Sequence, residues 1–471
     1  MAKHSDSGNE GAEPGSVGGR LLSVFNLRPT EMVPVLTAAV MFFCILFGYS
    51  LIRPVREAFG VERGMSELPS LFIATMVASF ALNPVFSWLV GRFDRRIFLP
   101  VAYGSIVLML LGFAAFRSVG GDEVISIWSG RVFFVWLSVI NVFMVGLFWS
   151  LMSDCFGPEQ SRRVFPSVAV GGTFGAVLGS ASAWAVSGGT FELLGRDYGK
   201  IGLTLEPSAM MVVSAVFVGL AGTISVGLSV LGAHRRGARS TDASDEPARD
   251  RRSGIREAVD GFWLALRSRY LMAIATYIGL MAVLMTVLYF KQAETVLEAR
   301  ASESGRVGAF ASIDFWAQIT TLVFQLVLTA KLIRWIGIGW ALVLLPMMVL
   351  AGCAILALGE QSGWAAATLL GIITVVQAVF RAGRYAIARP AREMLFTVLS
   401  RDEKYKAKSL IDTFVYRAGD VAGVGLRAGV ATLSVGALTA MAATVAPIAI
   451  VMAGLALWLG SEQARRATPK A

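Results

Sequence analysis

The stretch that decides the fold is YSLIRPVRE (49–57), which closes the first long apolar segment of the chain. A second copy, YAIARPARE (385–393), closes the tenth such segment, and five of the nine positions are identical in the two copies. Each copy places two arginines and a glutamate beside an apolar run of about 20 residues, the length that crosses a bilayer as a helix. Because an arginine inside a membrane costs about 2.5–3.5 kcal/mol, these repeated charges predict a functional site.

The composition predicts a protein that crosses a membrane many times. Of its 471 residues, 55% are hydrophobic and 16% are charged, whereas soluble domains carry about 25% charged residues. The three cysteines, Cys44, Cys155 and Cys353, are widely spaced in or beside apolar segments and are interpreted as small buried hydrophobes. The only histidines, His4 and His234, lie in polar stretches. We therefore expect no metal, no cofactor and no histidine proton relay.

Apolar runs of helical length recur twelve times, which predicts an all-α membrane protein with twelve transmembrane helices. The expected spans are 32–52, 68–91, 97–116, 132–152, 164–187, 208–232, 271–290, 307–330, 336–358, 364–380, 418–436 and 439–460.

Lysine and arginine are concentrated in the connections that share a side with the termini. By the positive-inside rule this bias places the N and C termini in the cytoplasm. It also explains most of the net charge of +10 as membrane topology, so nucleic acid is not an expected partner.

The polar stretch between the sixth and seventh spans divides the chain into two halves of six helices. We expect a disordered cytoplasmic tail (1–31), an N-terminal half (32–232), a cytoplasmic linker that leads into an interfacial helix (233–260), a C-terminal half (261–460) and a short cytoplasmic tail (461–471). This organisation resembles the major facilitator superfamily.

The connection GRFDRR (91–96) resembles a shortened form of the acidic-basic loop motif of that superfamily. Asp94 is then a candidate gating residue, and the alternative is an ordinary basic cytoplasmic loop. In such folds the first helix of each three-helix repeat lines the central cavity. Here these are spans 1, 4, 7 and 10. The fourth span also ends near a charge, with Trp149 and Asp154, and the seventh ends with Lys291 and Glu294.

The spacing within the motif predicts which of its arginines is paired. Arg53 and Glu57 are four residues apart and share a helix face, as do Arg389 and Glu393. Arg56 and Arg392 would then be free to bind an anion, because a guanidinium group can hold two phosphate oxygens at once. The alternative is that the arginines extend toward lipid headgroups.

Aromatic and acidic residues complete the candidate site. Tyr49, Trp149 and Tyr385 are candidate stacking surfaces for a nucleobase, or interfacial anchors. Asp314 in the eighth span is either a coupling residue or a contact between helices.

Small residues recur at every fourth position of the fifth span: Gly171, Gly175, Gly179 and Ala183. This spacing predicts close packing against another helix. It does not indicate a nucleotide-binding loop, because no strand precedes it and no Lys-Ser or Lys-Thr follows.

Three stretches resemble the ATP/ADP (NTP/NDP) exchange transporters of plastids and intracellular bacteria. They are MFFCILFGYSLIRPVREAFG (41–60), FWSLMSDCFGPEQSRRVF (148–165) and RPAREMLFTVLSRDEKYKAKSLIDTFVYRAGD (389–420). In that family a lysine in each of the two motifs is implicated in transport, and Arg56 and Arg392 occupy these places here. Asp154 and Glu294 are candidates for the acidic transport residues of the family.

The resemblance implies a transporter that exchanges an anionic, phosphorylated substrate, such as a nucleotide, across a bacterial inner membrane. It implies that the protein is not an enzyme. Two alternatives stay open. One is a proton-coupled carrier for another metabolite or a drug, with Asp314, Glu294 or Asp154 as the protonated group. The other is a membrane sensor or enzyme, which the lack of HExxH and GxSxG motifs disfavours. The lipid bilayer is an expected partner, and a monomer is one option for the oligomeric state.

Overall fold

The computed structural model describes residues 31–118, 123–188, 190–193, 196–200, 204–240, 267–327, 329–400, 403, 408, 411–431 and 437–467. Nearly all of the predicted tail 1–31 and most of the linker 233–260, with the interfacial helix, lie outside these residues. Within them, helices continue past the boundaries expected at residues 232 and 460.

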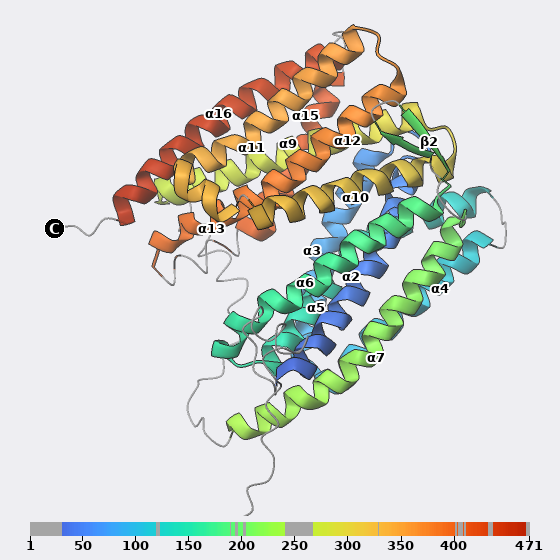
Figure 1. Ribbon diagram of the computed structural model, residues 1–471, viewed down its shortest axis with the longest axis vertical. Coiled ribbons are helices and arrows are strands. Elements are labelled where there is room, and N and C mark those ends of the chain that lie inside the picture. The colour runs from blue at the N-terminus through green and yellow to red at the C-terminus, as the bar shows by residue number, and fades with distance from the viewer. Residues whose placement is uncertain are drawn as a thin grey trace, which may run out of the picture.

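The structure consists of long, nearly parallel and antiparallel helices (Figure 1). The first group, here called the N-half, comprises α2 Met32–Gly60, α3 Leu68–Arg92, α4 Arg95–Ser118, α5 Glu123–Cys155, α6 Pro158–Val186 and α7 Pro207–Ser240. The second group, the C-half, comprises α9 Arg269–Ala299, α10 Glu303–Val327, α11 Thr329–Gln361, α12 Ala366–Ala382, η2 Gly383–Ala388, α13 Arg389–Leu395, η3 Phe396–Val398, η4 Ile411–Val415, α15 Tyr416–Ala431 and α16 Ala437–Ala467.

Eleven helices in the described part of the chain are long and apolar enough to cross a membrane. The predicted eleventh span corresponds to α15, of which 16 residues are described. The prediction of a multi-pass helical membrane protein is confirmed. One addition to the all-α expectation is a short antiparallel hairpin between α6 and α7, formed by β1 Thr190–Leu193 and β2 Arg196–Lys200.

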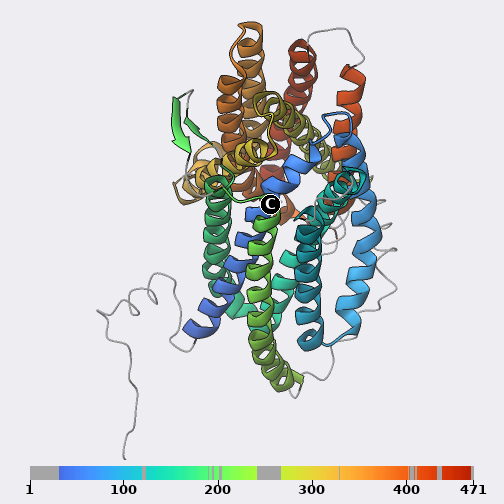
Figure 2. The ribbon, with the colours of Figure 1, turned by 90° about the vertical axis from the view of Figure 1, so that its right-hand side faces the viewer.

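The same helix pairs pack together in both halves. In the N-half, α2 packs on α6 and α4 packs on α7; in the C-half, the corresponding pairs are α9 with α15 and α11 with α16. Figure 2 shows the two groups as separate bundles, blue to green and yellow to red. A repeated packing of this kind is expected where two halves derive from repeats of one unit.

The glycine stripe of α6 makes the close helix contact that its spacing predicts. A Cβ atom at Gly171, Gly175 or Gly179 would collide with backbone carbonyl oxygens of α2. In the C-half, Gly419 of α15 lies equally close to the backbone of Gly279 on α9. Backbones that approach this closely gain van der Waals contact, which holds helices together where lipid offers no hydrophobic driving force.

Substituting Gly175 with alanine is expected to destabilise the N-half. The added methyl group would fall on the carbonyl oxygen of Phe43, so α2 and α6 must separate, at a cost of about 1–3 kcal/mol. The measurement is the apparent melting temperature of the purified protein in detergent. Gly112→Ala is the matched control, because its Cβ would meet no atom within 4 Å. Equal melting temperatures for the two variants would contradict the packing role.

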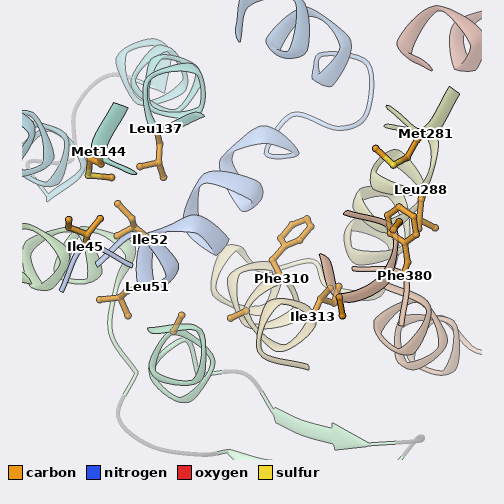
Figure 3. Packing of buried hydrophobic residues seen from close by; sticks show 14 of the residues in the cluster. Ile45, Leu51, Ile52, Leu137, Met144, Met281, Leu288, Phe310, Ile313 and Phe380 are labelled. Atoms are coloured by element: carbon orange, nitrogen blue, oxygen red, sulfur yellow. The ribbon is translucent and has the colours of Figure 1, made fainter. Parts of the chain in front are cut away.

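Apolar side chains fill the interior of each half. Figure 3 shows one cluster around the middle of α2, with Ile45, Ile52 and Leu137, and another between α9, α10 and α12, with Phe310 and Phe380. All five side chains are buried. These clusters hold the helices that carry the polar residues described below.

The halves meet mainly at one end of the bundle. In Figure 1, α6 and α10 lie close together near the hairpin and diverge toward the other end. The rings of Trp184 on α6 and Phe315 on α10 are 5.6 Å apart. We call the end where α2 begins and α16 ends the terminal face, and the opposite end, where α2 ends and α10 begins, the far face.

Candidate functional site

The first copy of the motif lies in the last turns of α2, where it faces the C-half. Pro54 sits inside this helix without ending it, so Arg53, Arg56 and Glu57 remain on one continuous segment. Glu57 is almost fully buried, and the side chain of Arg53 is 25% exposed. Buried charges of this kind require partners, and these come from both halves.

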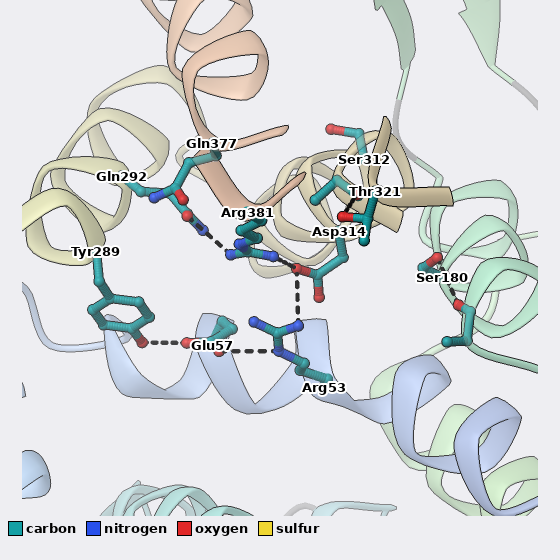
Figure 4. Close-up of polar contacts among 12 residues, drawn as sticks. Arg53, Glu57, Ser180, Tyr289, Gln292, Ser312, Asp314, Thr321, Gln377 and Arg381 are labelled. Carbon is teal, nitrogen blue, oxygen red and sulfur yellow. Dashed lines mark hydrogen bonds and ion pairs between the residues drawn. The ribbon is translucent and has the colours of Figure 1, made fainter. Parts of the chain in front are cut away.

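Asp314 joins the two halves through a pair of arginines. Its carboxylate lies 3.3 Å from a terminal guanidinium nitrogen of Arg53 and also forms an ion pair with Arg381 of α12. Arg381 donates a second hydrogen bond, of 3.3 Å, to the side-chain oxygen of Gln292 on α9. Figure 4 shows Asp314 between the two guanidinium groups. This acid therefore bridges α2 of the N-half and α12 of the C-half.

Glu57 forms a second link between the halves. Its carboxylate lies 3.8 Å from Nε of Arg53, so the predicted pairing along the helix is present. The hydroxyl of Tyr289 on α9 donates a hydrogen bond to the same carboxylate (Figure 4). Two carboxylates and two arginines thus make one continuous polar network across the interface.

Arg56 is not free, contrary to the sequence-based prediction. It forms an ion pair with the adjacent Glu57, donates a hydrogen bond of 2.9 Å to Ser138 on α5, and lies 4.9 Å above the ring of Phe134. Neighbouring residues do not share a helix face, but long side chains can curl around the helix to a common acid. Arg56 thereby belongs to the N-half side of the network around Glu57.

A π-helical turn presents a further arginine in the tenth span. In η2 the turn widens just before Pro390, which cannot donate a backbone hydrogen bond and would clash with the carbonyl of an ordinary helix. Within this turn Arg384 donates a hydrogen bond to the hydroxyl of Tyr416 and lies 5.0 Å from the ring of Tyr385. Tyr385 is 41% exposed.

The central network carries an excess of positive charge. Four guanidinium groups oppose two carboxylates: Arg53, Arg56, Arg381 and Arg384 against Glu57 and Asp314. Asp420 lies within electrostatic reach of Arg384 and is paired with Arg417, at 3.6 Å, so including this pair leaves the excess unchanged. The arrangement can therefore hold an anion with about two negative charges through charge-assisted hydrogen bonds.

The second copy of the motif lies closer to the terminal face and is paired differently from the first. Glu393 accepts hydrogen bonds from Lys408, at 2.7 Å, and from Arg392, at 3.3 Å. Arg389 is exposed, and its predicted pairing with Glu393 is not among the ion pairs of the described residues. The motifs are thus similar in sequence but different in geometry: the first lies in one continuous α-helix, whereas in the second the π-helical turn η2 takes in residues 385–388.

Most of the other predicted residues lie away from the central network. Lys291 is buried within the C-half, where it pairs with Glu360 and, at 3.4 Å, with Glu294. The ring of Trp149 packs against aromatic residues of the N-half. Asp154 and Asp94 lie at the terminal face, where α5 and α3 end. Tyr49, in contrast, is half-buried one turn before Arg53 and lies within electrostatic reach of Arg53 and Arg56.

The sequence reasoning missed Arg381 and Arg384, because they were assigned to the connection after the tenth span. Two arginines three residues apart, Arg381 and Arg384, directly after an apolar run of helical length, were the available signal. It also missed a polar cluster at the far face.

The far-face cluster joins the halves at the ends of α4 and α10. Arg117 at the end of α4 donates hydrogen bonds of 2.9 Å to both carboxylate oxygens of Glu303, the first residue of α10. It also lies 3.7 Å from Glu62 and 4.3 Å from the ring of Phe59. Burial raises the pKa of Glu62, against the lowering effect of Arg117. The cluster closes this end of the interface.

Among the described residues, no group of three or more histidine, cysteine, aspartate or glutamate side chains could hold a metal ion.

Comparisons with known proteins agree with this architecture. The family model for the TLC ATP/ADP transporter matches residues 117–464, and that for the Major Facilitator Superfamily matches residues 3–180. ADP,ATP carrier protein 1 of Chlamydia trachomatis is 24% identical over an alignment of 486 residues, which covers 92% of this chain and 88% of the carrier. The chloroplast ADP,ATP carrier protein 2 of Arabidopsis thaliana is 20% identical over 449 residues, covering 85% of this chain and 69% of the carrier.

Solved structures with the same fold are transporters of several kinds. A bacterial homologue of the iron transporter ferroportin, in an inward-facing state, superposes with a TM-score of 0.60 at 11% identity and covers 91% of this chain and 99% of that one. A mutant of the nucleoside transporter NupG superposes with a TM-score of 0.56 at 13% identity and covers 92% and 100%. The prediction of a fold like that of the major facilitator superfamily is confirmed.

Proposed function

The chain belongs to the TLC ATP/ADP transporter family, and on that premise we propose that it exchanges nucleotides across a bacterial inner membrane by alternating access. The observation that carries the proposal is the bridge between the halves at Asp314, where Arg53 and Arg381 converge on one carboxylate. An anionic substrate can replace that carboxylate.

The phosphates are assigned to the arginines of the central network. Arg53 approaches from the N-half, and Arg381 and Arg384 approach from the C-half, so a phosphate chain held by all three would touch both halves. The planar guanidinium fork matches phosphate oxygens in pairs. The exposed ring of Tyr385, beside Arg384, is the proposed stacking surface for the base.

The acids of the network explain why exchange is favoured over net uptake. In the empty site Asp314 and Glu57 stand in for the substrate, because they neutralise part of the positive charge of the arginines and tie α2 to the C-half. Moving the halves apart without a substrate would leave buried charges unpaired, which costs about 3–5 kcal/mol for each broken pair. A bound nucleotide supplies the missing negative charges, so reorientation becomes faster with substrate.

The described conformation is proposed to be open toward the terminal face. The far face is held by Arg117 and Glu303, and α6 and α10 diverge toward the other end (Figure 1). With the termini in the cytoplasm, this is an inward-facing state. Arg389 and Arg392 then lie on the cytoplasmic approach to the site, where positive charge attracts an anionic solute.

The test is uptake of labelled ADP into vesicles that contain the purified protein. We expect uptake into vesicles loaded with unlabelled ATP or ADP to exceed uptake into empty vesicles by about tenfold or more, since each broken pair corresponds to a barrier of more than 1.4 kcal/mol. Heat-denatured protein is the control. Equal uptake into empty vesicles would contradict exchange, and uptake that requires a proton gradient would support the proton-coupled alternative.

A further inference from the structure

A long apolar groove runs along the outer side of the N-half, between α3, α4 and α5. It encloses about 1230 Å³ and extends from Ser66 at the far face to Phe93 near the terminal face. Val101 and Ile97, on its α4 wall, are 62% and 67% exposed. In a helix bundle that spans a membrane, a groove with such walls faces lipid, so the bilayer supplies its occupant.

The far end of the groove is polar, in contrast to the rest. Arg131 of α5 donates a hydrogen bond of 3.0 Å to Glu67, the residue before α3, and forms an ion pair with it. Its guanidinium group lies 4.9 Å from the ring of Trp128, which is 58% exposed. Tryptophan is typical of the level of lipid headgroups. The groove is thus polar where a lipid headgroup lies and apolar where its chains lie.

The length of the groove fits an acyl chain. From Arg131 to Phe143, α5 rises by about 18 Å, at 1.5 Å per residue. Half of the hydrocarbon core of a bilayer measures about 15 Å. A chain that starts at the polar end would therefore reach the middle of the membrane inside the groove.

The polar end of the groove carries one positive and one negative charge, Arg131 and Glu67, and this determines which lipid headgroup fits. A headgroup with only a phosphate would meet Arg131 but bring its negative charge beside Glu67. A zwitterionic headgroup with a primary ammonium group can place its phosphate on Arg131 and donate hydrogen bonds to Glu67, while the cation faces the ring of Trp128. A trimethylated ammonium group has no hydrogen to donate.

We propose that this groove is a binding site for a phospholipid with an ethanolamine headgroup, held by Arg131, Glu67 and Trp128. The site does not depend on which solute is transported. The helix α3, which forms one wall of the groove, also contacts the C-half, because the ring of Phe72 lies 5.1 Å from that of Tyr289. A lipid in the groove therefore stabilises a helix that takes part in the interface between the halves.

Native mass spectrometry and thermal shift of the purified full-length protein test the site. The probes are phosphatidylethanolamine, phosphatidylcholine and phosphatidylglycerol with the same acyl chains. We expect phosphatidylethanolamine to bind about tenfold more tightly than the other two, the ratio that one charge-assisted hydrogen bond provides. Equal binding of all three lipids, or no bound lipid, would overturn the proposal.

Variants separate the headgroup contacts from the groove itself. Glu67→Gln is expected to remove the preference for ethanolamine, and Arg131→Gln to weaken all three lipids. Ala102→Trp fills the groove, and its control is Val216→Phe, which adds bulk to a lipid-facing position on α7 outside the groove. If Ala102→Trp does not fold, the two headgroup variants still decide the outcome. An unchanged lipid preference in Glu67→Gln would contradict the assigned contact.

Discussion

Replacing Arg53 with alanine is expected to reduce nucleotide exchange by about thirtyfold or more. Arg53 is the arginine that the N-half contributes to the bridge at Asp314, and it also supports Glu57. Truncating one partner of a buried, hydrogen-bonded charge pair costs about 2–5 kcal/mol, much of it because the other charge is left unpaired. In Arg53→Ala the contact that is lost is the one by which the N-half is proposed to bind the phosphates of the substrate. The measurement is the initial rate of labelled ADP uptake into ADP-loaded vesicles.

Further variants identify the reason for the loss. Arg381→Ala should be as severe as Arg53→Ala, because it removes the opposite side of the same bridge. Arg53→Lys should retain part of the activity, since it keeps the charge but loses the planar fork. The control is Arg465→Gln, whose side chain is 78% exposed at the end of α16. Full exchange activity in Arg53→Ala would refute the assignment of phosphate to this network.

The duplicated motif contains one of the two arginines that meet at Asp314. Its spacing identified Arg53 and Glu57, and the pairing of these two residues is confirmed. Arg381 could not be paired with Asp314 from the sequence, because that contact depends on how α10 and α12 are rotated about their axes. A hydropathy pattern defines which residues cross the membrane, but not which polar face points toward another helix.

The second copy shows why similar sequences need not have similar geometry. Arg392, which was also predicted to be free, shares its position in the motif with Arg56, and each arginine pairs with the glutamate that follows it. The two copies differ in place, because Arg392 and Glu393 lie near the terminal face, beside Lys408. The difference in place arises because α12 and α13 run in the opposite direction to α2. The π-helical turn η2, which takes in the first four residues of the second copy, was predicted by no residue pattern. By contrast, close packing of the α6 glycine stripe against another helix was predicted correctly, because small residues at every fourth position have one simple structural consequence in a membrane. The sequence did not identify α2 as that helix.

Reversing the charge of Arg117 is expected to open the far face. Glutamate at this position would face Glu303 and Glu62 and replace two hydrogen bonds of 2.9 Å with repulsion between like charges. Such a change costs several kcal/mol at an interface. A shift of about 3 kcal/mol changes the ratio of two conformations by more than a hundredfold. Most molecules of Arg117→Glu should therefore leave the conformation described here.

Spin labels measure this shift directly. Glu206 at the start of α7 and Gln361 at the end of α11 are exposed on the far face and belong to different halves. The distance between labels at these positions, from double electron–electron resonance, should increase in Arg117→Glu and in Glu303→Arg. Exchange should slow in both variants, because one of the two conformations becomes rare.

The double variant Arg117→Glu/Glu303→Arg tests whether the pair itself holds the far face closed. It restores attraction between the two positions, and the new arginine also stays within electrostatic reach of Glu62. The stacking of Arg117 on Phe59 and its hydrogen bond to Ser126 are not restored, so recovery should be partial. A double variant that is as open as the single variants would show that closure depends on the aromatic and apolar contacts below the cluster, since only the ion pair is sensitive to the sign of both charges.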